Sequence, residues 1–288
     1  MDKTHTKKYD FKIINAVANF LNSNFENTVT EDVLSIMKSG VPDEYAVSLL
    51  IGEGGGMDTF GKDRADWNKY FPQVVKKQNP DVYLNDEYFK RVLFTGQKLG
   101  NAELCYQQYN AYEPFVLDDL SLSFDGVILP KIGFFDSDFR YPAVKENGRI
   151  WMTVTPNEIN TMKEPISKAN GKVLTLGLGL GYFAFSCAIK NNVSSITVIE
   201  KNPEIISLFE NCILPFFPKD KHIEIINSDA IDFMKNPTVT DFDFVFCDLW
   251  HDVSDGISLW LKLKEFEKNF EKAEFRYWIE KSMQYYIK

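Results

Sequence analysis

The sequence has few cysteines, few glycines and prolines, and no long hydrophobic run. Its 288 residues include 4 Cys, 16 Gly and 12 Pro. Glycine and proline this scarce exclude collagen and low-complexity disorder. A chain of this length can bury about three-quarters of its unfolded surface, so its folding requires neither a disulfide nor a metal. A hydrophobic content of 44% and a charged content of 25% are typical of a folded soluble protein.

The four cysteines are too widely spaced for a metal or disulfide framework. Cys105, Cys187, Cys212 and Cys247 form no CxxC motif, so we expect reduced thiols, a cytoplasmic location and no bound metal. The N-terminus lacks a signal-peptide core, and no apolar run reaches the length of a membrane span. We therefore expect no membrane association.

An excess of basic residues is also absent. The chain has 32 Lys and Arg against 41 Asp and Glu, a net charge of -9. Neither the first 170 residues nor the remainder is basic, whereas tight nonspecific binding of nucleic acid usually needs several Lys or Arg contacts to phosphates. The balance disfavours nucleic acid and favours a small-molecule substrate, and it leaves a homodimer open.

Residues 1–150 are predicted to form an N-terminal domain of helices and β-hairpins that recognises the substrate. Apolar spacing predicts helices within residues 10–50. The glycine-rich segment 52–56 predicts a flexible loop. Short strands with turn signals follow from residue 115, including a hairpin turn at Asn147-Gly148.

Residues 151–288 are predicted to form a second domain, which begins with a helix and then alternates strands and helices. Thr155-Pro156-Asn157-Glu158 has the pattern of a helix start, with Thr155 as N-cap and Pro156 at the first helical position. Strands are expected at 173–176, 196–200, 223–227, 242–248 and 274–279, with helices near 182–191, 203–215, 229–235 and 256–272. This order predicts an α/β fold, with a mainly parallel sheet and helices on both faces. Ligands of such sheets bind outside the carboxyl ends of the strands.

A glycine-rich turn follows the first of these strands. Gly177, Gly179 and Gly181 stand at alternate positions before a helix, where glycine lets the backbone turn sharply and approach a ligand. A tight turn without a ligand is the alternative interpretation.

Acidic residues follow the second and third strands. Glu200 ends the second strand, and its carboxylate can accept hydrogen bonds from both hydroxyls of a ribose; a solvated strand-end glutamate is the alternative. Asp229 and Ala230 follow the third strand, where a carboxylate can accept from an adenine amino group and an amide can donate to the ring. An ordinary helix N-cap at Asp229 is the alternative there. Together with the glycine turn, these positions predict an adenosine-containing cofactor across three neighbouring strand ends.

The fourth strand places candidate catalytic residues at the same edge. Asp248 can orient or deprotonate a nucleophile. His251 is the best general base among only three histidines, because imidazole as a side-chain type ordinarily titrates near neutral pH. Trp250 can stack on an acceptor or stabilise a cation through its ring face. The alternatives are that Asp248 caps the following turn and that His251 is merely exposed.

At these residues the sequence resembles the class I S-adenosylmethionine-dependent methyltransferases. Gly177, Gly179 and Gly181 match the first motif of that family, Glu200 its ribose-binding acid, and Asp229-Ala230 its adenine contact. The resemblance implies a Rossmann-like fold, S-adenosylmethionine as cofactor and methyl transfer to an acceptor that the sequence does not name. It also implies cofactor contacts by the neighbouring residues Leu178, Tyr182, Lys201 and Asp248.

Three alternatives to a methyltransferase stay open. Thr175 stands where many members of the family have an acid, which looks more like the spermidine-synthase-type branch and keeps an aminopropyltransferase in consideration. A non-catalytic module that binds S-adenosylmethionine is the second alternative. The third is a nicotinamide dinucleotide site, because Gly179, Gly181 and Ala184 fit G-x-G-x-x-A and Glu200 follows about 20 residues later. That site would leave Asp229-Ala230 unexplained.

Overall fold

The computed structural model describes residues 3–24, 27–37 and 40–287, and the chain forms two compact units. One unit comprises residues 1–81 and 108–140, and the other comprises residues 82–107 and 141–288. The sequence suggested a single boundary near residue 150. Instead, residues 82–107 and 141–150 belong to the unit that contains the C-terminal sheet.

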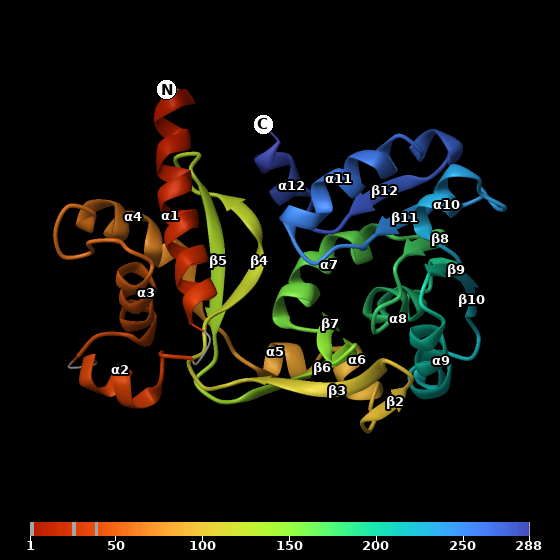
Figure 1. The fold of residues 1–288 in the computed structure, drawn as a ribbon, viewed down its shortest axis with the longest axis horizontal. Coiled ribbons are helices and arrows are strands. Elements are labelled where there is room, and N and C mark those ends of the chain that lie inside the picture. Colours follow the sequence, from red (N-terminus) through yellow and green to blue (C-terminus); the bar gives the residue numbers. More distant parts are fainter. Residues whose placement is uncertain (1–2, 25–26, 38–39, 288) are drawn as a thin grey trace. The chain divides into compact units, whose positions relative to one another are not determined.

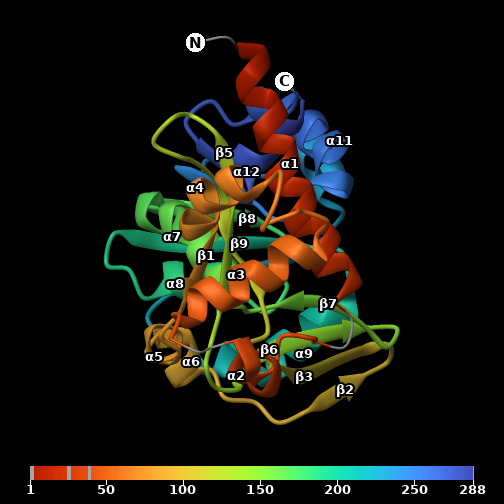
Figure 2. The same cartoon turned by 90° about the vertical axis from the view of Figure 1, so that its left-hand side faces the viewer.

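The first unit combines four helices with a small sheet. Strand β1 pairs in parallel with β5, and β5 pairs antiparallel with β4. Helices α1, α3 and α4 pack on these strands and stand in front of β1 and β5 in Figure 2. The core contains fully buried aromatic side chains such as Phe71 and Phe134. The elements are α1 (Lys3–Ser23), α2 (Glu31–Met37), α3 (Asp43–Gly54), α4 (Arg64–Val74), β1 (Val75–Lys77), β4 (Phe115–Leu122) and β5 (Ile128–Phe134).

The glycine-rich segment 52–56, expected to be a loop, is helical as far as Gly54. Three of its glycines, Gly52, Gly54 and Gly55, allow close packing, whereas a Cβ atom on Gly56 would meet nothing within 4 Å. A Cβ atom on Gly52 would lie 2.8 Å from a methyl carbon of Thr59 and 3.1 Å from Trp67, and one on Gly55 would overlap the carbonyl oxygen of Ala16. The expectation was wrong because glycine here permits helix packing.

The second unit begins with two short helices and a four-stranded sheet in the order β2-β3-β6-β7. The hairpin predicted at Asn147-Gly148 joins β6 to β7, and both turn residues have positive φ, 52° and 77°, as a two-residue hairpin turn of this kind requires. The elements are α5 (Asp81–Leu84), α6 (Glu87–Arg91), β2 (Gln97–Leu99), β3 (Ala102–Tyr109), β6 (Phe139–Glu146) and β7 (Arg149–Thr153).

A five-stranded parallel sheet follows, in the order β10-β9-β8-β11-β12. Counted along the chain this is the order 3-2-1-4-5, which is that of a doubly wound, Rossmann-like sheet. All five expected strands and the helices between them are present. Most ends differ by a few residues, but the helix expected near 256–272 spans Val253–Lys264 and so ends eight residues earlier. The elements are α7 (Pro156–Lys168), β8 (Gly171–Leu176), α8 (Tyr182–Ala188), β9 (Val193–Glu200), α9 (Pro203–Cys212), β10 (His222–Asn227), α10 (Ala230–Lys235), β11 (Phe244–Cys247), α11 (Val253–Lys264), β12 (Glu274–Tyr277) and α12 (Glu280–Tyr286).

Helices cover both faces of this sheet, α7 to α9 on one and α10 to α12 on the other (Figure 1). Every residue of β11 is buried, as expected for a parallel strand with helices on both sides. On the first face, the ring of Phe183 in α8 stacks on Phe246 with 4.2 Å between centroids. No helix in the described segments is long and apolar enough to cross a membrane.

Candidate ligand site

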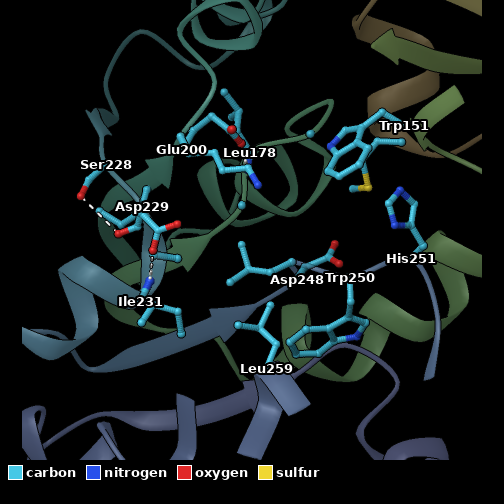
Figure 3. Close-up of a pocket in the computed structure, with 17 residues that line it drawn as sticks. Trp151, Leu178, Glu200, Ser228, Asp229, Ile231, Asp248, Trp250, His251 and Leu259 are labelled. Carbon is cyan, nitrogen blue, oxygen red and sulfur yellow. Dashed lines mark hydrogen bonds between the residues drawn. The ribbon is translucent and has the colours of Figure 1, made fainter. Parts of the chain in front are cut away.

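A pocket of about 120 Å³ lies where the carboxyl ends of β8 to β11 meet. The strand order reverses between β8 and β11, and such switch points are where open α/β sheets bind ligands. Nine of the predicted site residues line this pocket, and the other two, Gly181 and Tyr182, are not among the described residues of its wall. The nine are Gly177, Leu178, Gly179, Glu200, Lys201, Asp229, Ala230, Asp248 and His251. Figure 3 shows Glu200, Asp229, Asp248 and His251 around the pocket.

Two glycines form the floor of the pocket, and neither position has room for a side chain. Gly177 has φ +95°, and a Cβ atom there would overlap the backbone oxygen of Asp248. Gly179 has φ +49°, and its Cβ would lie 2.7 Å from the terminal methyl of Met152. Positive φ and close approach both select glycine. The turn is therefore shaped by contacts within the protein and leaves its backbone facing the pocket.

Gly181 and Tyr182 support the turn from outside the main pocket. Gly181 is the N-cap of α8 with φ +72°, and a side chain there would overlap the ring of Phe209. The hydroxyl of Tyr182 donates to Asp86 Oδ2 at 3.1 Å. From α6, the buried Tyr88 hydroxyl donates to the carbonyl of Leu180 at 2.6 Å. Residues 86–88 thus fix the turn from beneath, a role that the sequence did not suggest.

Glu200 connects the end of β9 to the glycine turn. Its Oε2 accepts from the backbone N–H of Leu178 at 3.1 Å, and its Oε1 accepts from that of Asn202 at 2.8 Å. A carboxylate has about four acceptor positions, so two remain for donors in the pocket. Glu200 therefore has a structural role that is compatible with binding a ligand.

Asp229 caps helix α10, the alternative that the sequence left open. Its Oδ1 accepts from the N–H groups of Ile231 and Asp232 at 2.8 and 3.2 Å. The structure gives no partner for Oδ2 among the described residues, and Asp229 lines the pocket next to Ala230. One oxygen thus orders the helix start while the other stays available to a ligand.

Asp248, at the end of β11, lines both the main pocket and a smaller cavity beneath α7. Burial raises the pKa of Asp248 to about 7. The smaller cavity also contains Glu158 of α7, which is 9% exposed and whose Oε2 has no hydrogen-bond partner in the part of the chain that the structure describes. Burial, and secondly the charge of Asp248, raise the pKa of Glu158 well above its ordinary value. The two acids are close enough that they compete for protons.

Glu158 was not predicted as a site residue, because its position suggested only a helix start. Thr155 does cap α7, accepting from the Glu158 N–H at 3.5 Å. A sequence signal for burial was nevertheless present. Glu158 precedes Met162 by four residues and Pro165 by seven, so it lies on the apolar stripe of the helix, and all three are buried.

The rim of the pocket is formed by two aromatic rings, one from β7 and one from the loop between β11 and α11. Trp151 of β7 meets His251 edge to face, with 4.4 Å between centroids, and Lys201 Nζ lies 6.0 Å from the Trp151 ring. Figure 3 places both rings above the Asp248 carboxyl and Trp250 below it. Trp151 was not predicted, because nothing local to β7 indicates that it reaches this edge.

Two hydrogen bonds attach the four-stranded sheet β2-β3-β6-β7 to the ligand edge. Asn202 Nδ2 donates to Glu146 of β6 at 2.7 Å, and the backbone N–H of Asn101 donates to Glu204 of α9 at 2.9 Å. The start of α9 is thereby attached to β6 and to the turn before β3. This attachment positions Trp151 and Met152 over the glycine turn.

His251 is held by an acid on the same turn. Its Nδ1 lies 3.1 Å from Asp255 Oδ2, and its backbone N–H donates to the same carboxylate. If Nδ1 carries the proton, Nε2 is left as a proton acceptor. Trp250, by contrast, is 4% exposed and stacks on Tyr277, so it is mainly a core residue with one edge at the pocket.

The described residues contain no group of three or more His, Cys, Asp or Glu side chains arranged to hold a metal ion. All four cysteines are free, and Cys187 and Cys247 are buried. Burial raises the pKa of Cys187 to about 12, which makes it a poor nucleophile.

Comparison with known proteins gives similarity to solved structures only. No family model matches the sequence, and no match was found among curated proteins. Spermidine synthase from Thermotoga maritima is 16% identical over 37% of this chain and 43% of its own, with a TM-score of 0.29. MnmC2 from Aquifex aeolicus is 14% identical over 51% and 55%, with a TM-score of 0.30.

Precorrin-8w decarboxylase from Methanobacterium thermoautotrophicum is 18% identical over 40% of this chain and 56% of its own, with a TM-score of 0.30. In each of the three cases the match spans less than two-thirds of the solved protein. Similarity at this level does not identify a substrate.

Proposed function

We propose that the chain is an S-adenosylmethionine-dependent methyltransferase that acts on a small-molecule acceptor. The observation that carries this proposal is the convergence of the glycine turn, Glu200 and Asp229 on one pocket at the switch point of the sheet. Each of the three has a structural explanation of its own. Their shared pocket is what matches a ligand with an adenine, a ribose and a third part.

The ligand would lie along the strand ends in a fixed order. Adenine would sit beside Asp229 and Ala230, where the Asp229 oxygen can accept from its amino group. The ribose hydroxyls would donate to Glu200, and the sulfonium would lie over Gly177 towards Asp248. This order places the reactive methyl group beneath the rim formed by Trp151 and His251.

Methyl transfer is an in-line displacement in which the protein mainly positions the reactants. A lone pair on the acceptor attacks the methyl carbon, the carbon–sulfur bond breaks, and its electron pair returns to sulfur as the thioether of S-adenosylhomocysteine. The acceptor proton would pass to Asp248, whose pKa of about 7 suits a general base at neutral pH, or to Nε2 of His251.

Aminopropyl transfer is the second candidate, and one observation favours it. The only carboxyls of the cavity beneath α7 are those of Glu158 and Asp248, and the described part of the chain contributes no Lys, Arg or His to its wall. Such a cavity suits an ammonium group, and decarboxylated S-adenosylmethionine carries that group without a carboxylate beside it.

A turnover assay separates the two candidates. The protein is incubated with S-adenosylmethionine, or with its decarboxylated form, together with fractions of small metabolites. Release of S-adenosylhomocysteine from the first is the expected result. Release of methylthioadenosine from the second alone would establish the aminopropyl reaction. Release of neither product from any fraction would contradict both.

A further inference from the structure

Glu158 is a buried acid, and one of its carboxyl oxygens has no partner among the described residues. It is 9% exposed, and its Oε2 has no hydrogen bond. A buried ionised carboxylate without a partner is costly, so such groups are usually protonated, paired or bound to a cation. An orphaned oxygen that faces a cavity can be completed by a group from outside the chain, such as a water molecule, an ion or a ligand.

The cavity that Glu158 lines is small and has acidic and apolar walls. Its free space is about 20 Å³, enough for a group of the size of a water molecule. Tyr182 lines it too, but its hydroxyl already donates to Asp86. The buried Thr175 hydroxyl is directed at the carbonyl of Gly177 at 3.4 Å. The hydroxyls of Tyr182 and Thr175 therefore do not have their protons free for the Glu158 oxygen. Thr153 is the third hydroxyl residue of the wall, and it gives no hydrogen bond to that oxygen in the described structure.

The cavity continues the main pocket. Met152, Gly177, Leu178 and Asp248 line both, so the glycine turn and the Asp248 carboxyl form their common wall. Glu158 lines the smaller cavity but not the main pocket. A ligand that crosses Glu200 and the glycine turn would reach Glu158 with its far end.

We propose that Glu158 binds the ammonium group at the end of the ligand's amino-acid chain, as a carboxylate supplied by helix α7. This assignment rests on the proposed function, because it needs the adenosine part of the ligand to lie at Asp229 and Glu200. Pairing with a cation lets Glu158 ionise next to Asp248 without leaving two adjacent negative charges unbalanced. Charge-assisted hydrogen bonds of this kind are stronger than neutral ones.

The proposal also explains why β8 can end with Thr175 in place of an acid. That side chain is 2% exposed and lines the same cavity as Glu158. An acid at position 175 would be the third carboxyl there, and repulsion among three would raise their pKa values further. One carboxylate from α7 meets the need for a cation partner.

The experiment compares two nucleosides that differ at the far end. S-adenosylhomocysteine has the amino-acid chain, whereas 5′-methylthioadenosine lacks the ammonium and the carboxylate. Calorimetry gives the affinity of each for the wild type, for Glu158→Gln, for Glu158→Asp and for Glu164→Gln. Glu164 is an exposed acid of the same helix and serves as the matched control.

The wild type and Glu164→Gln should bind S-adenosylhomocysteine at least about tenfold more tightly than methylthioadenosine. Glu158→Gln should lose this preference while its affinity for methylthioadenosine stays unchanged. Glu158→Asp, which keeps the charge on a shorter side chain, should retain part of the preference.

If Glu158→Gln prefers S-adenosylhomocysteine over methylthioadenosine as strongly as the wild type does, the assignment is overturned and the proposed function stands. Failure of both nucleosides to bind the wild type would overturn the proposed function, and the assignment with it.

Discussion

The carboxylate of Glu200 accepts a hydrogen bond from the backbone N–H of Leu178, with 3.1 Å between oxygen and nitrogen. Its other oxygen accepts from the N–H of Asn202. One side chain at the end of β9 thus holds both the turn that follows β8 and the residue that caps α9, and it faces the pocket. Changes at Glu200 should therefore affect folding and ligand binding together.

Replacing Glu200 with Ala should destabilise the protein by about 1–3 kcal/mol, because two backbone donors lose their acceptor. Affinity for S-adenosylmethionine should fall at least about tenfold through loss of the ribose contact. Chemical denaturation and calorimetry measure the two effects. Glu210→Ala, at an exposed position of α9, is the control and should change neither. Unchanged affinity in folded Glu200→Ala would remove Glu200 from the binding site.

Replacing Gly179 with Ala should destabilise the fold more than the same change at Gly148. Both residues have positive φ, 49° and 77°, so both variants carry a strain of about 1–2 kcal/mol. A Cβ at Gly148 meets nothing within 4 Å, whereas one at Gly179 meets Met152 at 2.7 Å. Thermal denaturation measures the difference, and Met152→Ala should partly rescue Gly179→Ala. Equal losses of stability in Gly179→Ala and Gly148→Ala would show that Met152 moves away from the new Cβ atom at little cost.

The sheet and half of the site could be predicted because the signals are local. Apolar runs mark the strands, and parallel strands bring their carboxyl ends to one edge. Gly177, Glu200 and Asp229 each follow a strand directly, so chain order alone assembles them. The same reasoning placed Asp248 and His251 in the pocket.

The remainder depends on contacts that the sequence does not display. Glu146 and Asn101 attach the four-stranded sheet β2-β3-β6-β7 to α9, and this attachment brings Trp151 of β7 to the pocket. Tyr88 supports the glycine turn from a segment that lies 92 positions earlier in the chain. Helix α3 continues through Gly54, although glycines usually signal loops. Its glycines lie against neighbours that leave no room for a Cβ atom, and those neighbours lie elsewhere in the sequence.

The stability of the unliganded protein should fall as the pH rises from about 4 to about 7. Asp248 binds its proton more tightly in the folded state, where its pKa is about 7, than in the unfolded chain. Its contribution is therefore complete below the unfolded pKa and is lost as the pH rises through the folded pKa. The slope from this group is at most about 1.4 kcal/mol per pH unit, and the raised pKa of Glu158 acts in the same direction.

Asp248→Asn isolates this effect, because the amide stays neutral at every pH. Urea denaturation at about pH 5 and about pH 8 should show a smaller difference between the two conditions in the variant than in the wild type. Parallel pH profiles of wild type and Asp248→Asn would show that Asp248 is ionised in the folded protein throughout this range.

His251 should act through the nitrogen that Asp255 does not hold. His251→Phe keeps an aromatic ring against Trp151 and removes both nitrogens, so we expect turnover to fall by about a hundredfold or more with cofactor affinity nearly unchanged. Asp255→Asn, which weakens the hold on Nδ1, should give a smaller loss. Full turnover in His251→Phe on an identified acceptor would assign proton transfer to Asp248 alone.

The central claim is that the pocket at the switch point binds S-adenosylmethionine. Calorimetric titration of the wild-type chain with S-adenosylmethionine, with its decarboxylated form and with NAD⁺ tests it most directly. The account predicts saturable micromolar binding of S-adenosylmethionine at one site, weakened in Glu200→Ala and retained in Glu210→Ala. Micromolar binding of NAD⁺ with no binding of S-adenosylmethionine would contradict it.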